Sequence, residues 1–189
     1  MLEYFTDINI IFDNYDSLLN TRMNLKENDL IKIKMMDYAH TDFEDNHFDL
    51  IYAQASISVP GRKNILKEVK RILSDEGLLS VSEIVSLKEP VAGFIKDIWE
   101  RSGLEPLTSA GIKTYFESKG FEVISEKDLS DTLRDFYEKV RFSVSKASKD
   151  EKEKDKKYFS RMKHESHAYL KLGGDKFIGY ISLIMRKSN

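Results

Sequence analysis

Asp13 and Asp37 are the side chains of this sequence best placed to do chemistry, because each directly follows a short apolar run. If the two runs are parallel strands, both carboxylates lie at the edge of the sheet where open α/β folds bind ligands. A carboxylate there can accept hydrogen bonds from the two hydroxyls of a ribose, which suits a nucleoside. The alternative is that each aspartate only caps a turn, a common role for this residue. Position alone does not decide between them.

Histidines are the candidate general bases, since their ordinary pKa lies nearest to neutral. His40, His164 and His167 could serve, but none is singled out. His164 and His167 are three residues apart rather than the four of a zinc-protease helix, so packing or surface roles are favoured over a metal site. The chain has no cysteine, which excludes disulfides, thiolate catalysis and cysteine-bound metals. We therefore expect no metal.

The elements that must position these residues follow from the apolar periodicity, which predicts an α/β fold. Leu66, Val69 and Ile72 mark one face of an amphipathic helix, with Glu68 and Arg71 on its exposed face. Gly77 is expected to stop that helix in a left-handed conformation, and Ser109 and Ser130 to cap later helices. Strands are predicted at Ile8–Phe12, 30–36, Phe48–Gln54, 78–85, 121–124 and 177–185, and helices at 16–26, 91–101, 109–119, 130–144 and 158–172, with a solvated linker or exposed helix over 145–157.

This alternation predicts a mainly parallel sheet covered on both faces. The length of 189 residues suits a single domain, with core elements in 1–85, a mostly helical substrate or lid region in 86–176, and a final strand in 177–189. The net charge of −2 gives no field for nucleic acid. No segment approaches a membrane span and no signal peptide is present, so a cytoplasmic protein is expected.

The segment "MMDYAHTDFEDNHFDLIYAQASIS" resembles the class I S-adenosylmethionine-dependent methyltransferases, which have a strand, an acidic residue, a loop and then Phe-Asp-Leu-Val or a similar strand. "NILKEVKRILSDEGLLSVSEI" is similar to the helix, turn and strand that follow in that family. The resemblance implies a Rossmann-like, mostly parallel sheet with an antiparallel C-terminal strand, and S-adenosylmethionine as cofactor. Beyond this core, the Gly-Gly, strand and basic tail that end the chain are similar to N-methyltransferases acting on sarcosine and dimethylglycine.

The resemblance also implies roles for individual residues. Asp13 would hold the ribose hydroxyls, Asp37 would accept from the adenine amino group, and Tyr38 would pack on the adenine ring. Ala53 and Gln54 would line the methionine and methyl-transfer side. The chain would transfer a methyl group to a small molecule by in-line displacement, which requires orientation more than a protein nucleophile.

One family feature is missing. The glycine-rich loop that follows the family's first strand lies close to the cofactor, but the first glycine of this chain is Gly61. The sequence thus resembles an N-terminally truncated methyltransferase, and binding of S-adenosylmethionine by the chain alone is expected to be weak or absent. Strands two and four would pair directly, or the gap would be filled from elsewhere.

Three hypotheses follow from the missing loop. In the first hypothesis, the missing strand and loop are encoded upstream or supplied by a complementing chain, giving an active enzyme. Alternatively, the domain is degenerate and non-catalytic and serves as a binding or regulatory partner. In the third hypothesis, Ile8–Phe12 moves into the first-strand position and the reduced sheet binds another ligand. An exposed strand edge would also favour a homodimer or a partner.

Overall fold

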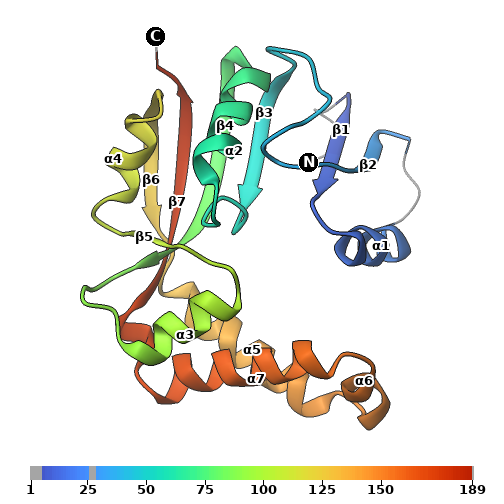
Figure 1. Ribbon diagram of the computed structural model, residues 1–189, viewed down its shortest axis with the longest axis vertical. Helices are drawn as coiled ribbons and strands as arrows, with labels where there is room; N and C mark the ends of the chain where they lie inside the picture. The colour runs from blue at the N-terminus through green and yellow to red at the C-terminus, as the bar shows by residue number, and fades with distance from the viewer. Residues whose placement is uncertain (1–5, 26–28, 189) are drawn as a thin grey trace.

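The computed structural model describes residues 6–25 and 29–188 (Figure 1). Its strands are β1 (Ile8–Phe12), β2 (Ile31–Met35), β3 (Phe48–Gln54), β4 (Leu73–Ser86), β5 (Leu107–Thr108), β6 (Phe121–Asp128) and β7 (Ile178–Lys187). Its helices are α1 (Tyr15–Asn24), α2 (Arg62–Ile72), α3 (Gly93–Arg101), α4 (Ile112–Glu117), α5 (Thr132–Lys146), α6 (Lys149–Lys154), α7 (Lys156–Lys171) and the 3₁₀ turn η2 (Gly174–Lys176).

The strands form two separate sheets rather than one. β1 and β2 pair in parallel, and the larger sheet has the order β3-β4-β7-β6, with the short β5 beside β4. β3 and β5 run parallel to β4, whereas β7 is antiparallel to both β4 and β6. The predicted α/β class with an antiparallel C-terminal strand is therefore confirmed.

The position of β1 answers one of the three hypotheses. Within the described residues, β1 pairs with β2 alone and β3 with β4 alone, so β1 does not occupy the place beside β3. The expectation that Ile8–Phe12 moves into the first-strand position is wrong, and β1 and β3 do not pair directly either. In Figure 1 the two strands flank a space, and both arrows point the same way.

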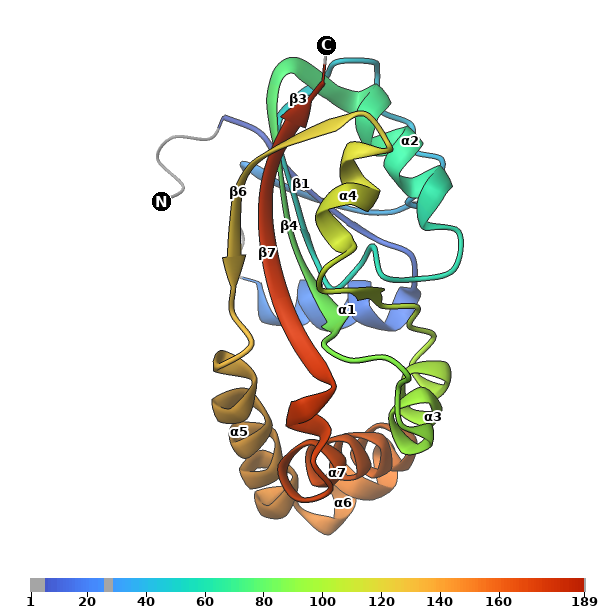
Figure 2. The same ribbon diagram turned by 90° about the vertical axis from the view of Figure 1, so that its left-hand side faces the viewer.

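The core lies between the larger sheet and the helices α2 and α4. Leu66 of α2 and Phe116 of α4 are buried against Leu79, Val81 and Leu183 of the sheet. Figure 2 shows both helices on the same side of the sheet. On the opposite side, the exposed apolar side chains of the described sheet include Leu50, Tyr52, Leu78 and Ile184. The prediction that helices cover both faces is therefore wrong for the larger sheet.

A second cluster of buried side chains holds α3, α5 and α7 together beyond one end of the sheet (Figure 1). Trp99 of α3 packs there with Tyr137 of α5 and Tyr169 of α7. The rings of the two tyrosines stack with their centroids 4.4 Å apart. The charged stretch 145–157 is helical over α6 and the start of α7, which is the exposed-helix alternative. No helix in the described part of the chain has both the length and the apolarity to cross a bilayer.

Local predictions fail where a side chain or backbone finds a distant partner. Gly77 has no left-handed backbone and lies inside β4, where a β-carbon would come within 2.9 Å of the Phe48 carbonyl oxygen. Ser109 does not cap α4, whose cap position is Gly111. Ser130 does not cap α5 with its side chain, because its Oγ accepts a hydrogen bond from the Tyr180 amide. For Gly77 and Ser130 a non-local contact outweighs the local preference.

Candidate functional site

Asp13 and Asp37 are brought together by the pairing of β1 with β2. Phe12 is opposite Met35, and the Met36 amide donates to the Phe12 carbonyl oxygen at 2.9 Å, so the pairing continues to the last residue of β1. The two aspartates follow directly at this edge. Both line a cavity of about 400 Å³, together with Tyr38 and with residues of the loop after β3. The sequence-based expectation that the carboxylates converge is met.

The Asp37 side chain is held by its own turn. Its Oδ1 accepts a hydrogen bond from the Ala39 amide at 2.8 Å, and the His40 amide donates to the Asp37 carbonyl oxygen at 2.9 Å. Tyr38 is half-buried between the two aspartates. Burial, and then the negative charge of Asp13, raise the pKa of the Tyr38 hydroxyl, so it stays protonated and can donate. The cavity thus presents two carboxylates and one aromatic ring.

The loop after β3 forms the opposite wall and is held by a buried carboxylate. Glu83 of β4 is 1% exposed; its Oε1 accepts from the amides of Ser56 and Ile57 at 3.2 and 3.0 Å, and its Oε2 from the amide of Ser58 at 3.0 Å. Burial raises the pKa of Glu83, and the three amides oppose that effect. The loop turns at Ala55, whose φ of 50° is left-handed. Sequence reasoning missed Glu83; the available signal was one acid within an apolar strand.

A second buried glutamate holds the loop that carries Asp37. Glu68 of α2 accepts from the amide and the hydroxyl of Thr41 at 2.9 and 2.6 Å, and it pairs with Arg71 at 2.6 Å. Arg71 also reaches Asp45 at 2.7 Å. The expectation that Glu68 lies on the exposed face of the helix is wrong, because its side chain is 8% exposed. The hydrogen bonds from Arg71 and Thr41 outweigh burial and lower the pKa of Glu68 to about 2.

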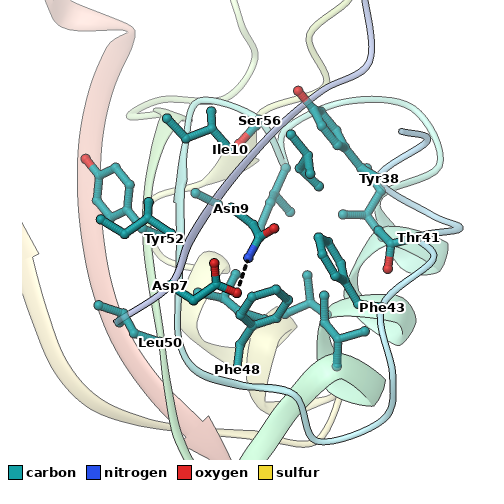
Figure 3. A pocket seen from close by; sticks show the side chains of 18 residues that line it. Asp7, Asn9, Ile10, Tyr38, Thr41, Phe43, Phe48, Leu50, Tyr52 and Ser56 are labelled. Atoms are coloured by element: carbon teal, nitrogen blue, oxygen red, sulfur yellow. Dashed lines mark hydrogen bonds between the residues drawn. The ribbon is translucent and has the colours of Figure 1, made fainter. Parts of the chain in front are cut away.

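Ala53 lies at the second, larger cavity rather than at the first. This cavity, of about 820 Å³, lies between β1 and β3, and its lining is mostly apolar (Figure 3). Tyr38, Ser56 and Ile65 line both cavities, so the two adjoin. Ala53 is therefore separated from Asp13 and Asp37 by these shared residues.

Gln54 lines neither of the two cavities. Its side-chain amide donates to the Tyr180 hydroxyl at 3.0 Å and accepts from the Tyr52 hydroxyl at 3.1 Å. Tyr180 packs against the buried cluster of α3, α5 and α7, so Gln54 lies between the sheet and the helices. The role of Gln54 on the methyl-transfer side stays a prediction.

The histidines form no metal centre in the described residues. His40, His164 and His167 are all exposed, and no group of three or more metal-ligating side chains occurs there. Two carboxylates that accept hydrogen bonds and one aromatic ring face the smaller cavity, a combination that suits a polar ligand with a flat ring.

A family model described as a methyltransferase domain matches residues 8–81. This range includes Asp13, Asp37 and Tyr38, and it confirms the resemblance drawn from the residue motifs. No curated protein matches the chain.

Solved structures show the same fold at low sequence identity. A protein assigned as a sarcosine dimethylglycine methyltransferase from Galdieria sulphuraria has a TM-score of 0.73 at 18% identity, with 96% of this chain and 70% of that chain covered. The [4+2]-cyclase SpnF has a TM-score of 0.74 at 21% identity, with 96% and 67% covered. A geranyl diphosphate C-methyltransferase from Streptomyces coelicolor A3(2), solved with S-adenosyl-L-homocysteine, has a TM-score of 0.70 at 10% identity, with 96% and 63% covered. At these identities the likeness establishes the fold alone.

Proposed function

We propose that this chain is a S-adenosylmethionine-dependent methyltransferase that acts on a small molecule and that it contributes the adenosine side of the cofactor site. The observation that carries the proposal is the convergence of Asp13, Asp37 and Tyr38 on one cavity of about 400 Å³. The matched methyltransferase-domain model supports the proposed class. The neighbour solved with S-adenosyl-L-homocysteine supports the choice of cofactor.

The residues present fit an adenosine group. Carboxylates only accept hydrogen bonds when ionised, so Asp13 suits the two ribose hydroxyls and Asp37 suits the adenine amino group. The half-buried ring of Tyr38 offers a stacking surface. When bound, S-adenosylmethionine supplies an electrophilic methyl group on a sulfonium.

The chain's own contribution to such a reaction is orientation. Glu83 and Glu68 hold the two loops of the cavity by their backbones, which keeps the recognising groups in place before a ligand arrives. Ala53 and Gln54 lie at the end of β3, and we assign them to the methyl-transfer side. No nucleophile in the protein is needed for an in-line displacement.

A second candidate function is a non-catalytic, methyltransferase-like binding module. The cavity between β1 and β3 favours it, because in the described residues these two strands do not pair and the sheets are separate. SpnF also bears on it, since a protein of this fold is described as a cyclase and the fold alone does not set the reaction. Equilibrium binding without turnover of any methyl acceptor would support this second function.

The test of the cofactor assignment is the substitution Asp37→Asn. It replaces a carboxylate, which has two acceptor oxygens, with an amide, which has one acceptor oxygen and one donor group. We therefore expect the Kd for S-adenosylhomocysteine to rise about tenfold, the value of one good hydrogen bond to a charged group. Isothermal titration calorimetry measures it. The matched control is Asp42→Asn, which changes an exposed aspartate of the same loop that pairs with Lys34 outside the cavity. Equal affinities for the Asp37→Asn variant and the unchanged chain would contradict the assignment.

A further inference from the structure

A short strap, residues 102–106, leads from α3 to β5 and is bonded to the loop after β3 (Figure 1). The Glu105 amide donates to the Ser58 carbonyl oxygen at 2.9 Å. The Ser58 amide in turn donates to Glu83 at 3.0 Å, so Ser58 is held by both of its backbone groups. Because residues of this loop line the smaller cavity, the strap contacts the segment that forms the cavity's wall.

Arg62 holds the strap in that position. It is the first residue of α2 and directly follows the loop after β3. Its Nη2 donates to the Glu105 carbonyl oxygen and lies 3.4 Å from Oε2 of the Glu105 carboxylate. Its guanidinium also lies over the ring of Tyr115 of α4, 5.7 Å from the ring centroid. One side chain thus joins the start of α2 to the strap.

The other end of the strap belongs to the helical cluster of α3, α5 and α7. The Ser102 hydroxyl donates to Glu165 of α7 at 2.9 Å. Leu104 packs against the buried side chains of the cluster, and its amide donates to the Trp99 carbonyl oxygen at 2.8 Å. The strap therefore links these helices to the loop that lines the smaller cavity.

The burial of Arg62 does not favour a purely stabilising role. Its side chain is 11% exposed, and its Nη1 is buried without a hydrogen-bond partner among the described residues. An unpaired buried donor lowers stability. The carboxylate of Glu105 is 57% exposed, so the ion pair adds little. A methionine can fill much of the same space without an unpaired donor, but it cannot donate to the Glu105 carbonyl oxygen.

We propose that Arg62 is a positioning residue for the smaller cavity, which it serves by clamping Glu105 and thereby seating the strap against the loop after β3. Loss of the clamp leaves the strap free to move away from Ser58. A ligand must then order the loop as it binds, which lowers affinity. The inference rests on the proposed function, because adenosine is the ligand whose binding reports the position of the loop.

The first measurement needs no ligand. Amide hydrogen exchange, followed by NMR at single residues, reports directly on the amides of Glu105 and Ser58. We expect Arg62→Met to speed exchange at both amides at least about fivefold, because the loop loosens together with the strap. The amide of Val81, a fully buried residue of β4, should keep its rate. An equal increase at Val81 would mean that Arg62 only stabilises the whole fold, and it would overturn the proposal.

The second measurement is a titration with adenosine, followed by NMR. We expect Arg62→Met to raise the Kd at least about fivefold. Arg62→Lys can still donate to the Glu105 carbonyl oxygen and should restore part of the affinity. Lys63→Met is the matched control, since Lys63 is the next residue of α2 and is exposed. Its Kd and its exchange rate at Glu105 should equal those of the unchanged chain.

The two measurements separate the clamp from the cofactor assignment. If the unchanged chain binds no adenosine, the proposed function fails, while exchange at Glu105 and Ser58 still decides whether Arg62 positions the loop. Faster exchange in Arg62→Met with an unchanged Kd would show that the strap does not position the cavity. Unchanged exchange at Glu105 in Arg62→Met would also overturn the proposal, and it would leave the assignment of Asp37 intact.

Discussion

At the scale of single residues, two buried glutamates determine the shape of the candidate site. Glu83 holds the loop after β3 through three backbone amides, and Glu68 holds the loop after β2 through Thr41. Glu83 lies on β4 and Glu68 on α2, and each fixes a loop that lines the cavity of Asp13 and Asp37. Both glutamates position other groups, because neither lines the cavity of about 400 Å³ that Asp13 and Asp37 line.

The substitution Glu83→Gln should destabilise the fold. A glutamine offers one acceptor oxygen where the carboxylate offers two, so at least one buried amide loses its partner at a cost of about 1–3 kcal/mol. Urea unfolding at neutral pH measures the change. Glu122→Gln is the control, since Glu122 is exposed and its pair with Arg186 contributes at most about 1 kcal/mol. An equal effect of the two substitutions would mean that the loop does not depend on Glu83.

Glu68 predicts a pH dependence of stability. Its pKa falls from 4.5 to about 2 on folding, so the folded state favours the ionised form. That stability is fully present above about pH 5 and is lost as the pH falls from about 4.5 toward 2. Glu68→Gln should therefore be less stable than the unchanged chain at pH 7, and the difference should shrink at pH 3. Urea unfolding at both pH values checks this; a difference that does not change with pH would contradict the ion pair.

At the scale of elements, the sequence pattern predicted most of the secondary structure. Ile8–Phe12 and Phe48–Gln54 are strands with the predicted bounds, because polar residues flank each apolar run. α2 was found from its apolar spacing. The turn predicted at 74–77 is wrong, because β4 begins at Leu73, directly after the helix. An irregularity in the pairing with β3, between Phe48 and Leu50, accommodates the extra residues of β4.

Gly77 provides a test of that junction. A β-carbon there would lie 2.8 Å from Cδ1 of Leu73 and 2.9 Å from the Phe48 carbonyl oxygen, so Gly77→Ala forces β3 and β4 apart locally. We expect a loss of about 1–3 kcal/mol of unfolding free energy, as for other overpacked sites. Gly93→Ala is the control, because nothing lies within 4 Å of its β-carbon position and alanine favours a helix. Thermal unfolding of both variants measures the difference, and a stable Gly77→Ala would argue for a true turn at 74–77.

At the scale of the whole molecule, the two separate sheets and the apolar cavity between β1 and β3 determine what the chain can bind. The smaller cavity, which Asp13 and Asp37 line, lies where β1 and β2 end and is closed on its other side by the loop after β3. The larger cavity between β1 and β3 adjoins it. The family model covers only residues 8–81, and α3, α5 and α7, which lie beyond that range, pack in a cluster of their own. The expectation that this helical region selects the methyl acceptor stays a prediction.

Binding of nucleosides by the isolated chain should reflect this division. We expect adenosine and S-adenosylhomocysteine to bind with Kd values within about threefold of each other, both in the high micromolar range or weaker, because the groups contacted are those of adenosine. Isothermal titration calorimetry on the 189-residue chain measures both. Submicromolar binding of S-adenosylhomocysteine alone would show that the methionine side is complete in this chain.

By itself, the sequence determined the elements and the meeting of Asp13 with Asp37, because apolar periodicity and the shared edge of parallel strands are local or nearly local properties. The lack of glycine before Gly61 also predicts that the family's first strand and glycine-rich loop are missing, and this stays a prediction. Only the tertiary structure decided that β1 and β2 form a separate sheet, that one face of the larger sheet is open, and that Glu68 and Glu83 are buried. These features depend on partners 25 to 27 residues away, as for Glu83 with Ser58 and Glu68 with Thr41, and no local pattern specifies such pairs.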